Sequence, residues 1–416
     1  MVDRRLAHGE RLPTVRSLAS SLGVSAGTVA LAYRRLGDRG IVTTAGRRGT
    51  VVSLQPPLPP RPSAPPPLDV RDLARGNPDP RLLPPLGPAF RKLGAGHVLY
   101  GAPARLPELE RIARERFATD GISGEIAVTS GALDGIERAL VSHLRRGDGV
   151  VVEDPTWPRI ADLIRALGLR PEPVAIDDRG FLPGDLERAL QKRPRALIAT
   201  PRGQNPTGAS FDAERALALR SVVASSRSLL VIEDDYVDRV SGAPYHPLHG
   251  TTDYWVVIRS LSKTLGPDLR IALLAGDDVT ISRLEGRQLL GAGWVSHLLQ
   301  GLAAQLLASL ATERLLARAD RTYTERRDCL RKALADRGIP SLGGSGLGIW
   351  VPVAHEAETV QFLLANGWNV SAGQRYRFSA PPGIRVTTTT LERDEAKALA
   401  EAIAASQTDS ASTYDG

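Results

Sequence analysis

The stretch WVVIRSLSKTLGPDLRIALLA, residues 255–275, places two apolar runs on either side of a short loop. Trp255–Ser260 and Ile271–Ala275 consist mainly of β-branched and aliphatic residues, which predicts two buried strands. The loop between them holds Lys263, one of five lysines among 53 basic residues. Arginine cannot form a Schiff base at neutral pH, whereas a lysine amine of lowered pKa can. Lys263 is therefore a candidate nucleophile, although a lone lysine is more often a surface residue.

Short apolar runs of the same kind recur before this stretch, and amphipathic segments separate them. The runs are Ile126–Thr129, Val150–Glu153, Ala196–Thr200 and Leu229–Asp234, and the segments are Leu133–Leu144, Pro158–Leu167 and Asp212–Ser226. This alternation predicts an α/β domain with a mostly parallel sheet, flanked by helices on both faces. Ligand chemistry is then expected in loops at the carboxyl ends of the strands.

The chain changes character after about residue 300. Helical patterns at Val295–Leu310 and Ala311–Gly338 precede short strand patterns at Gly346–Pro352 and Ile384–Thr388. We expect a small α+β subdomain over residues 301–405, within a body formed by residues 71–405. The polar residues 406–416 are expected to form a disordered tail.

The positive charge lies almost entirely at the start of the chain. Residues 1–52 carry nine arginines, no lysine and three acidic residues, whereas the rest carries 44 bases and 43 acids. This asymmetry favours a nucleic-acid-binding head on a neutral body, with a solvated basic face as the alternative. Eight prolines between Pro56 and Pro67 predict an extended, semi-rigid linker over residues 53–70.

Composition excludes several other classes. The apolar fraction of 42% and charged fraction of 24% describe a globular protein. No apolar run is long enough to span a bilayer, and the first thirty residues lack the order of a secretory signal, so we expect a cytoplasmic protein. The single Cys329 and seven scattered histidines show no metal-ligand spacing, and we expect no metal site.

The segment LPTVRSLASSLGVSAGTVALAYRRLGDRGIVTTAGRRGTVV, residues 12–52, predicts a helix-turn-helix followed by a hairpin. A first helix after Pro13 would bury Val15, Leu18, Ala19 and Leu22, and Gly23 would form the turn. A second helix, N-capped by Ser25, would bury Val29, Ala32 and Leu36. The residues expected to contact base edges, at the start of this helix, are Ser25, Ala26, Gly27 and Thr28. The residues expected to contact phosphates are Arg16, Arg34 and Arg35. The hairpin tip holds Arg47 and Arg48, placed for a backbone or minor-groove contact.

Polar residues follow the predicted strands of the body. A carboxylate at Asp234 could keep a pyridine nitrogen protonated, and Asn205 could donate to a phenolate oxygen. The backbone N–H groups of Gly131 and Ala132 precede a helix and could bind phosphate. The side-chain part of the same phosphate site would come from Ser260, Ser262 and Arg270. Trp157 could stack on a flat ring. Each feature also has an ordinary alternative, namely a helix cap, a turn or a core aromatic.

The head resembles the winged helix-turn-helix of the GntR family of regulators. Two features depart from that family. Only Met1–Leu6 remain where its members carry a full first helix, and Ala26 stands where an arginine is common. We therefore expect a truncated first helix and two helices that lack a packing partner. Either the true start codon lies upstream of Met1 or the head is a weakened DNA binder.

Residues 70–405 resemble fold-type I enzymes of the aminotransferase class I and II group, which use pyridoxal 5'-phosphate. The resemblance implies that Lys263 binds this cofactor covalently and that Asp234 pairs with its pyridine nitrogen. It also implies that Asn205 and Tyr236 lie at the 3-hydroxyl oxygen, with Trp157 against the ring. Further implied contacts are Arg385 to a substrate α-carboxylate and Tyr100 to the phosphate across a dimer interface. Departures from the family pattern occur at Ala102, Arg105, Glu110 and Leu133.

Together, the head, linker and body resemble the MocR subfamily of GntR-type regulators. This resemblance implies a homodimeric, pyridoxal phosphate-dependent transcriptional regulator that binds DNA near its own or a neighbouring gene and senses an amino-acid-like effector. The alternative is an aminotransferase, moving an amino group from an amino acid to a 2-oxo acid, whose DNA-binding head has decayed. A cofactor-free scaffold would leave Lys263, Asp234 and Asn205 unexplained.

Overall fold

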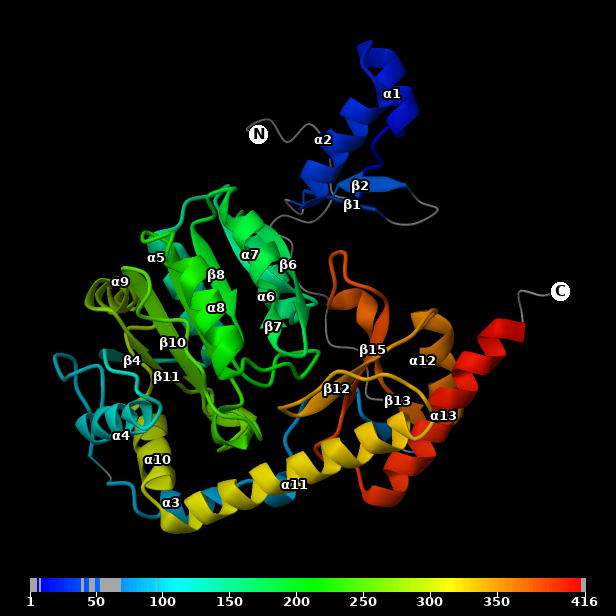
Figure 1. Ribbon diagram of the computed structural model, residues 1–416. Helices are drawn as coiled ribbons and strands as arrows, with labels where there is room; N and C mark the ends of the chain where they lie inside the picture. The colour runs from blue at the N-terminus through cyan, green and yellow to red at the C-terminus, as the bar shows by residue number, and fades with distance from the viewer. Residues whose placement is uncertain are drawn as a thin grey trace.

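The computed structural model describes residue 6 and residues 9–38, 41–44, 49–52, 69–94 and 96–412 (Figure 1). The expected linker, residues 53–70, lies outside this description except for its last two residues. Among the described residues, no helix combines the length and the apolar character needed to cross a bilayer.

An eight-stranded sheet organises the body. Its strands lie side by side in the order β4 (Glu125–Thr129), β11 (Ala272–Gly276), β10 (Tyr254–Ser260), β9 (Leu230–Asp235), β8 (Ala196–Ala199), β5 (Gly149–Asp154), β6 (Arg170–Asp177) and β7 (Gly180–Phe181). Strands β10, β9, β8, β5 and β6 run parallel to one another. The prediction of a mostly parallel sheet is confirmed.

Strand β11 runs antiparallel to both of its neighbours, which the sequence pattern did not indicate. A parallel neighbour would need a long crossover, usually a helix. The connection from Leu261 to Ile271 contains only the short turn η4 (Pro267–Leu269), so the chain reverses and returns beside β10. The loop that carries Lys263 therefore lies at the carboxyl end of β10.

Sequence patterning also missed strand β6, because its residues include Pro171 and Pro173. Proline has no backbone N–H and is rare in central strands. Strand β6 lies next to the sheet edge, where only the two-residue β7 follows it, and this position tolerates the missing donors.

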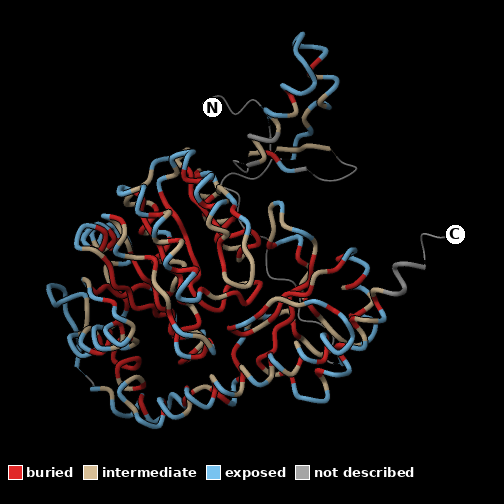
Figure 2. Tube along the Cα trace, in the orientation of Figure 1, coloured by how far each residue is buried: buried red, intermediate tan, exposed pale blue. Residues whose placement is uncertain are grey.

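Helices cover both faces of the sheet (Figure 1), and strands β5, β8, β9 and β11 between them are fully buried (Figure 2). Adjacent residues of β9 face opposite sides, since Ile232 packs with α5, α6 and α9 whereas Val231 packs with α7 and α8. The covering helices are α3 (Leu86–Phe90), α4 (Pro107–Ala118), α5 (Ala132–His143), α6 (Pro158–Ala166), α7 (Pro183–Leu190), α8 (Ala213–Val223), α9 (Asp278–Leu289) and α10 (His297–Leu307).

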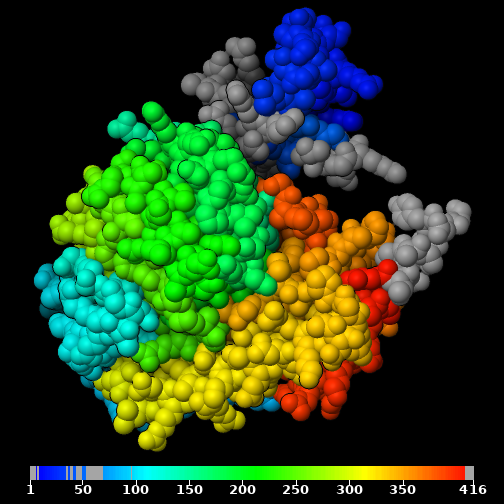
Figure 3. Space-filling model, in the orientation of Figure 1, coloured from blue at the N-terminus to red at the C-terminus, as the bar shows by residue number. Residues whose placement is uncertain are grey.

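A smaller unit forms beside this sheet, as expected from the sequence (Figure 3). It contains a three-stranded antiparallel sheet, the long helix α11 (Leu310–Ala335) and two further helices. Its other elements are β12 (Gly348–Pro352), α12 (Glu356–Ala365), β13 (Trp368–Asn369), β14 (Ser371–Ala372), the short turn η5 (Gly373–Arg375), β15 (Gly383–Thr387) and α13 (Arg393–Ser412). The short turns η2 (Pro80–Leu82) and η3 (Asp238–Val240) contact α11.

The first residues of the body also belong to this smaller unit. Strand β3 (Arg71–Asp72) pairs in parallel with β13, and Leu73 is buried in the same core as Ile384 and Val386. The expected range 301–405 therefore omits a segment that lies more than 200 residues earlier in the chain. Chain order alone does not reveal such a pairing.

Helix α13 differs from the expected disordered tail over residues 406–412. Ser406 is buried, and its hydroxyl donates to the carbonyl of Ile403 at 2.7 Å. Ala404 and Ala405 precede it, and alanine has the highest intrinsic helix propensity. The helix therefore continues through polar residues that composition alone assigns to a tail. Residues 413–416 lie outside the described part of the chain.

The head contains the predicted helices α1 (Val15–Leu22) and α2 (Ala26–Asp38) and the hairpin strands β1 (Val42–Thr44) and β2 (Thr50–Val52). Gly23 ends α1 in the left-handed conformation, with φ of 66°. The Ser25 hydroxyl accepts a hydrogen bond from Thr28 N at 3.1 Å, which is the predicted N-cap. Tyr33 donates to the Pro13 carbonyl at 2.8 Å and ties α2 to the start of α1.

The predicted core of the head is only partly correct. Ala19 and Val29 are buried between the helices, but Ala32 is exposed and Leu22 is 62% exposed. Val24 and Leu31 are exposed as well. Within the described residues, no third element covers this side of the helix pair, and for that reason its apolar residues face solvent.

Leu140→Ala is expected to lower the free energy of unfolding by about 2–5 kcal/mol, because Leu140 is fully buried between α5 and the sheet. Chemical denaturation of the two proteins measures this difference. Leu217→Ala on α8 is the matched control, since Leu217 is 70% exposed and the change is expected to stay within about 0.5 kcal/mol. Equal effects of the two substitutions would contradict the assigned core.

Candidate functional site

A cavity of about 520 Å³ opens at the carboxyl ends of the parallel strands. Strands β5, β8, β9 and β10 each contribute residues at or just after their ends, and β15 contributes from the smaller unit. The sequence-predicted residues that line this cavity are Ala132, Trp157, Asn205, Asp234, Tyr236, Ser260, Ser262, Lys263, Arg270 and Arg385. The structure therefore brings together side chains that span more than half of the chain.

Lys263 lies at the inner wall of the cavity. Its Nζ donates to the carbonyl of Gly76 at 2.5 Å, on the segment that follows β3. Burial, together with the positive charge of Arg385, lowers the pKa of Lys263 to about 8. The lowered pKa leaves more of the amine unprotonated near neutral pH than in an ordinary lysine, as a nucleophilic lysine requires.

Asp234 ends strand β9 and faces the same cavity. Its side chain is buried, and Oδ1 has no hydrogen-bond partner among the described residues. Burial raises the pKa of Asp234 to about 7, and the negative charges of Asp235 and Glu153 add to this effect. A buried carboxylate without a donor is costly. The site therefore suits a cationic N–H donor that enters the cavity.

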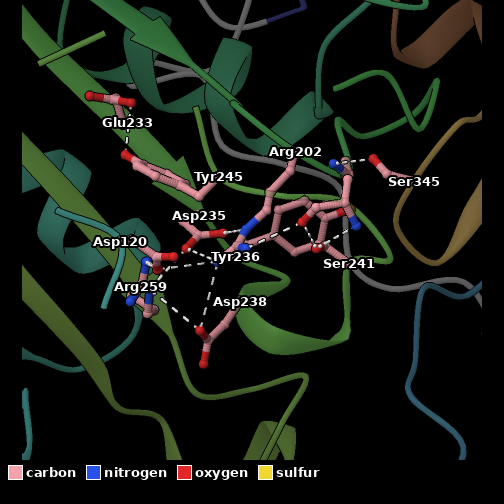
Figure 4. Close-up of polar contacts among 12 residues, drawn as sticks. Asp120, Arg202, Glu233, Asp235, Tyr236, Asp238, Ser241, Tyr245, Arg259 and Ser345 are labelled. Atoms are coloured by element: carbon pink, nitrogen blue, oxygen red, sulfur yellow. Dashed lines mark hydrogen bonds and ion pairs between the residues drawn. The ribbon is translucent and has the colours of Figure 1, made fainter. Parts of the chain in front are cut away.

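Asp235, the next residue, has a different environment. Arg202 binds both of its carboxylate oxygens at 2.8 Å, and Arg259 Nε donates to Oδ2 at 2.8 Å (Figure 4). Burial alone would raise the pKa of Asp235, but the two guanidinium groups hold it well below its usual range. Arg259 also contacts Asp120 at 2.7 Å, and Asp238 lies at 3.4 Å from Arg259 Nε.

Tyr236 extends into the cavity beside Asn205. The Tyr236 hydroxyl donates to the carbonyl of Gly203 at 2.6 Å (Figure 4), and burial raises its pKa above the usual value. Because its hydrogen is used there, this hydroxyl can only accept from a ligand in this arrangement. Asn205 Oδ1 is buried without a hydrogen-bond partner among the described residues.

One end of the cavity, where the N-terminus of α5 meets the loop after β10, has the groups needed to bind an anion. Gly131 adopts φ of 97°, and a Cβ built there would lie 2.8 Å from Arg270 Nη2. Ser260 Oγ accepts from Ser262 N at 3.2 Å, and Arg270 Nη2 donates to the Ser130 carbonyl at 3.4 Å. The free N–H groups of the helix, two hydroxyls and a guanidinium converge there, which suits a phosphate.

Arg385, on strand β15, gives the cavity a second positively charged region. It is buried, with Nη1 donating to the Tyr376 hydroxyl at 3.0 Å and Nη2 to Thr387 Oγ1 at 2.8 Å. No carboxylate of the described residues pairs with it. Burial opposes ionisation of Tyr376, but the charges of Arg385 and Arg375 and hydrogen bonds with Ser371 and Arg385 together outweigh it, and the pKa of Tyr376 lies below its usual value. A buried cation with neutral partners suits an incoming carboxylate.

Two known families match this chain. Residues 71–403 match the family described as aminotransferase class I and II, and residues 1–52 match the bacterial regulatory proteins of the gntR family. The vitamin B6 salvage pathway transcriptional repressor PtsJ of Salmonella typhimurium is 42% identical over 94% of this chain and 92% of its own length. The chain belongs to the MocR subfamily of GntR-type regulators.

Other comparisons agree with this assignment. The pyridoxine biosynthesis transcriptional regulator PdxR of Corynebacterium glutamicum is 31% identical over 89% of this MocR-type chain and 85% of its own. Among solved structures, the kynurenine aminotransferase of Pyrococcus horikoshii aligns with a TM-score of 0.73 at 21% identity, covering 82% of this chain and 91% of its own. That likeness establishes the fold of the body.

Some predicted site residues of this MocR-type chain lie elsewhere. Tyr100 is 93% exposed and lies outside the cavity of its own chain, with its ring 5.7 Å from that of Trp294. The head residues predicted to meet DNA and described with side chains are all exposed, namely Arg16, Ser25, Ala26, Gly27 and Thr28. The side chains of Arg34 and Arg35, and all of Arg47 and Arg48, lie outside the described part of the structure.

Glu153 and Gln204 are cavity residues that sequence reasoning missed. Glu153 accepts from Thr200 N at 2.8 Å, Thr200 Oγ1 at 3.0 Å and Gln204 Nε2 at 3.0 Å. Gln204 Oε1 in turn accepts from Thr207 N and Oγ1, at 3.0 and 2.6 Å. These bonds anchor both sides of the turn that carries Asn205. A sequence signal existed, since Glu153 is an acid at the end of an apolar strand.

Asp234→Asn and Asp235→Asn are expected to change stability in opposite directions. In the cofactor-free protein, the raised pKa of Asp234 means that its contribution to stability is lost as pH rises from about 4 through about 7. Asp234→Asn removes that loss, so this variant is expected to be the more stable protein at pH 8. Asp235→Asn removes the carboxylate that binds both Arg202 and Arg259 and is expected to cost about 3–5 kcal/mol. Denaturation at pH 5 and pH 8 measures both. Destabilisation by Asp234→Asn at pH 8 would contradict the assigned environment.

Proposed function

We propose that this chain is a pyridoxal 5'-phosphate-dependent transcriptional regulator that binds DNA through its head and a small ligand through its body. The observation that carries the proposal is the pair formed by Lys263 and the unpartnered, buried Asp234 in one cavity. The similarity to the repressor PtsJ supports it, since that similarity extends over 94% of the chain.

The cavity residues fit each part of the proposed cofactor. Pyridoxal phosphate, when bound, supplies an aldehyde carbon and an electron-withdrawing ring. Lys263 offers the amine that holds this carbon, and Asp234 keeps the ring nitrogen protonated by pairing with its N–H. The α5 N-terminus and Arg270 hold the phosphate. Asn205 donates to the ring oxygen, and Trp157 covers the ring face.

The body also suits a homodimer. Phe90, Leu99, Tyr100 and Leu298 are large apolar residues that are more than half exposed. Their segments adjoin, since His297 Nε2 lies 2.9 Å from the carbonyl of Pro103 and Leu93 packs near α10. Exposed apolar side chains of this size mark an interaction surface. A second copy on this surface would bring Tyr100 to the partner's cavity and present two heads to paired half-sites.

We propose that the ligand changes DNA binding because it binds one of two conformational states of the dimer more tightly than the other. A small molecule changes DNA binding only if it binds one state better than the other. The name of PtsJ points to vitamin B6 metabolism, which makes pyridoxal phosphate itself a candidate signal. Arg385 also suits the α-carboxylate of an amino-acid-like effector, as its neutral hydrogen-bond partners indicate.

The second candidate function is that of an aminotransferase with a vestigial head. The lowered pKa of Lys263 and the predicted residues that line the cavity favour it. Turnover of an amino donor with a 2-oxo acid at ordinary enzyme rates, together with no DNA binding, would establish this function instead.

Lys263→Ala is expected to abolish the adduct that borohydride reduction traps between the protein and pyridoxal phosphate, because no other lysine among the described residues lines the cavity. Mass spectrometry of the reduced protein measures the adduct. Lys192→Ala is the control, since Lys192 lies on the surface and pairs with Glu172. An adduct that survives in the Lys263 variant would overturn the cofactor assignment.

The double variant Arg47→Gln, Arg48→Gln is expected to weaken operator binding. It is also expected to reduce the salt dependence of the binding constant by the equivalent of about two phosphate contacts. Removal of residues 1–52 is expected to abolish binding. Fluorescence anisotropy on the gene's own upstream DNA, across a salt series, measures both effects. An unchanged slope in the double variant would remove the hairpin tip from the contact surface.

A further inference from the structure

The edge of the large sheet opposite the cavity carries a patch of exposed basic residues. Parallel strands β5, β6 and β8 begin at this edge, whereas the cavity lies at their carboxyl ends. The connections that enter these strands include residues 144–148, 167–170 and 191–195. Six exposed side chains there are positively charged, and we call them the basic edge: Arg145, Arg146, Arg170, Lys192, Arg193 and Arg195.

Hydrogen bonds hold the three connections of the basic edge side by side. Gly147 N donates to the Gly168 carbonyl at 2.8 Å, and Arg195 N donates to the Gly149 carbonyl at 2.8 Å. The side chain of Arg170 also reaches across, with Nε donating to the Gly147 carbonyl at 2.8 Å. Because neighbouring strands lie only about 4.8 Å apart, the six side chains form one continuous surface.

Few acidic residues balance the charge of the basic edge. The same connections and the first residues of β6 hold two, Asp148 and Glu172. Glu172 is shared, at 3.2 Å from Lys192 Nζ and 3.6 Å from Arg170 Nη1. The other four side chains make no hydrogen bond or ion pair with any residue that the structure describes, namely Arg145, Arg146, Arg193 and Arg195. A positive potential is therefore concentrated at the basic edge.

Acidic residues gather at the other end of the same sheet edge. They begin β4, precede β10 or follow the antiparallel β11, and they are Glu125, Asp253, Asp277 and Asp278. Arg227, which precedes β9, pairs with Asp253 at 2.6 Å and lies between the two groups. Residues 53–416 carry 44 bases and 43 acids, so the basic edge is a local separation of charge on a nearly neutral body.

The chemistry of the basic edge fits the phosphates of a nucleic acid. None of its three connections exposes a large apolar side chain, whereas a membrane-binding surface also needs apolar residues that insert between lipids. Arginine and lysine side chains without anionic partners are typical of phosphate contacts. Under the proposed function the head binds DNA. Since head and body are one chain, that DNA is held at a high local concentration around the body.

We propose that the basic edge is a second DNA-contacting surface, which binds phosphates of the duplex on either side of the segment held by the head. This inference rests on the proposed function, because it requires a head that binds DNA, and it adds a contact made by the body. Phosphate contacts carry no base sequence preference. The basic edge therefore adds affinity and length to the contact with DNA, and the head supplies the sequence preference.

The test is a salt series on the full-length, cofactor-loaded protein with the gene's own upstream DNA. One variant combines Arg145→Gln, Arg146→Gln, Arg193→Gln and Arg195→Gln. We expect it to bind about tenfold to hundredfold more weakly at about 0.1 M salt. The slope of log binding constant against log salt concentration is expected to fall by about two or more, since each lost phosphate contact removes about 0.9. Hydroxyl-radical footprinting should show a shorter protected region.

Two further variants separate the position of the charge from its amount. Lysine at the same four positions should keep the slope, because phosphate contacts of this kind need the charge. The charge-matched control places glutamine at four surface arginines that already pair with acids elsewhere on the body, and it should keep both slope and footprint. These are Arg111, Arg114, Arg179 and Arg337.

The absorbance of the bound cofactor checks the folding of each variant and is expected to be unchanged, since the basic edge lies opposite the cavity. DNA binding with an unchanged slope and footprint in the four-glutamine variant would overturn the inference and leave the proposed function intact. If that variant only lost stability, its arginines would be assigned to the helix C-termini that precede them. If it only lost binding to phosphatidylglycerol vesicles, the basic edge would be assigned to a membrane. Either result would overturn the inference as well. Wild-type protein that binds no DNA would overturn the proposed function and this inference together.

Discussion

Strand β9 ends in three consecutive buried carboxylates, those of Glu233, Asp234 and Asp235. The hydrogen bonds and ion pairs that each one needs determine which side chains surround it. Neighbouring strand residues face opposite sides, so Glu233 and Asp235 point away from the cavity while Asp234 points into it. Glu233 accepts from the Tyr245 hydroxyl and from backbone N–H groups, and Asp235 binds two arginines. A strand can bury adjacent anions only where each has its own donors. Asp234 is the member whose donor must come from a ligand.

Arg385 has two effects on the cavity that reinforce each other. Its charge helps to lower the pKa of Lys263, which keeps the amine reactive, and the same charge suits a carboxylate. An anion on Arg385 reduces the field at Lys263 and so raises the proton affinity of the amine. Occupancy of the two groups is therefore coupled through charge, without any movement of the chain between them.

Sequence reasoning found the residues that follow strands and missed those whose role depends on strand order. Lys263, Asp234 and Asn205 were predictable because each stands at or just after the end of an apolar run. Glu153 and Gln204 interact because β5 and β8 are neighbours in the sheet, and periodicity does not specify that order. Similarly, the pairing of β3 with β13 joins the two ends of the body. In the head, local caps at Gly23 and Ser25 were predictable, whereas the exposure of Leu22 depends on which elements cover it.

The segment after the linker passes through the ligand cavity. Gly76 accepts from Lys263, a Cβ on Gly76 would lie 2.7 Å from Arg385, and Asn77 lines the same cavity. Only about seven residues separate Gly76 from Asp69, where the described chain resumes after the linker, a span of at most roughly 25 Å when extended. The cavity is therefore bounded by residues that lie close to the start of the body. A ligand that displaces Gly76 would move a residue only seven positions after Asp69, so a ligand in the cavity acts directly on the segment through which the chain enters the body.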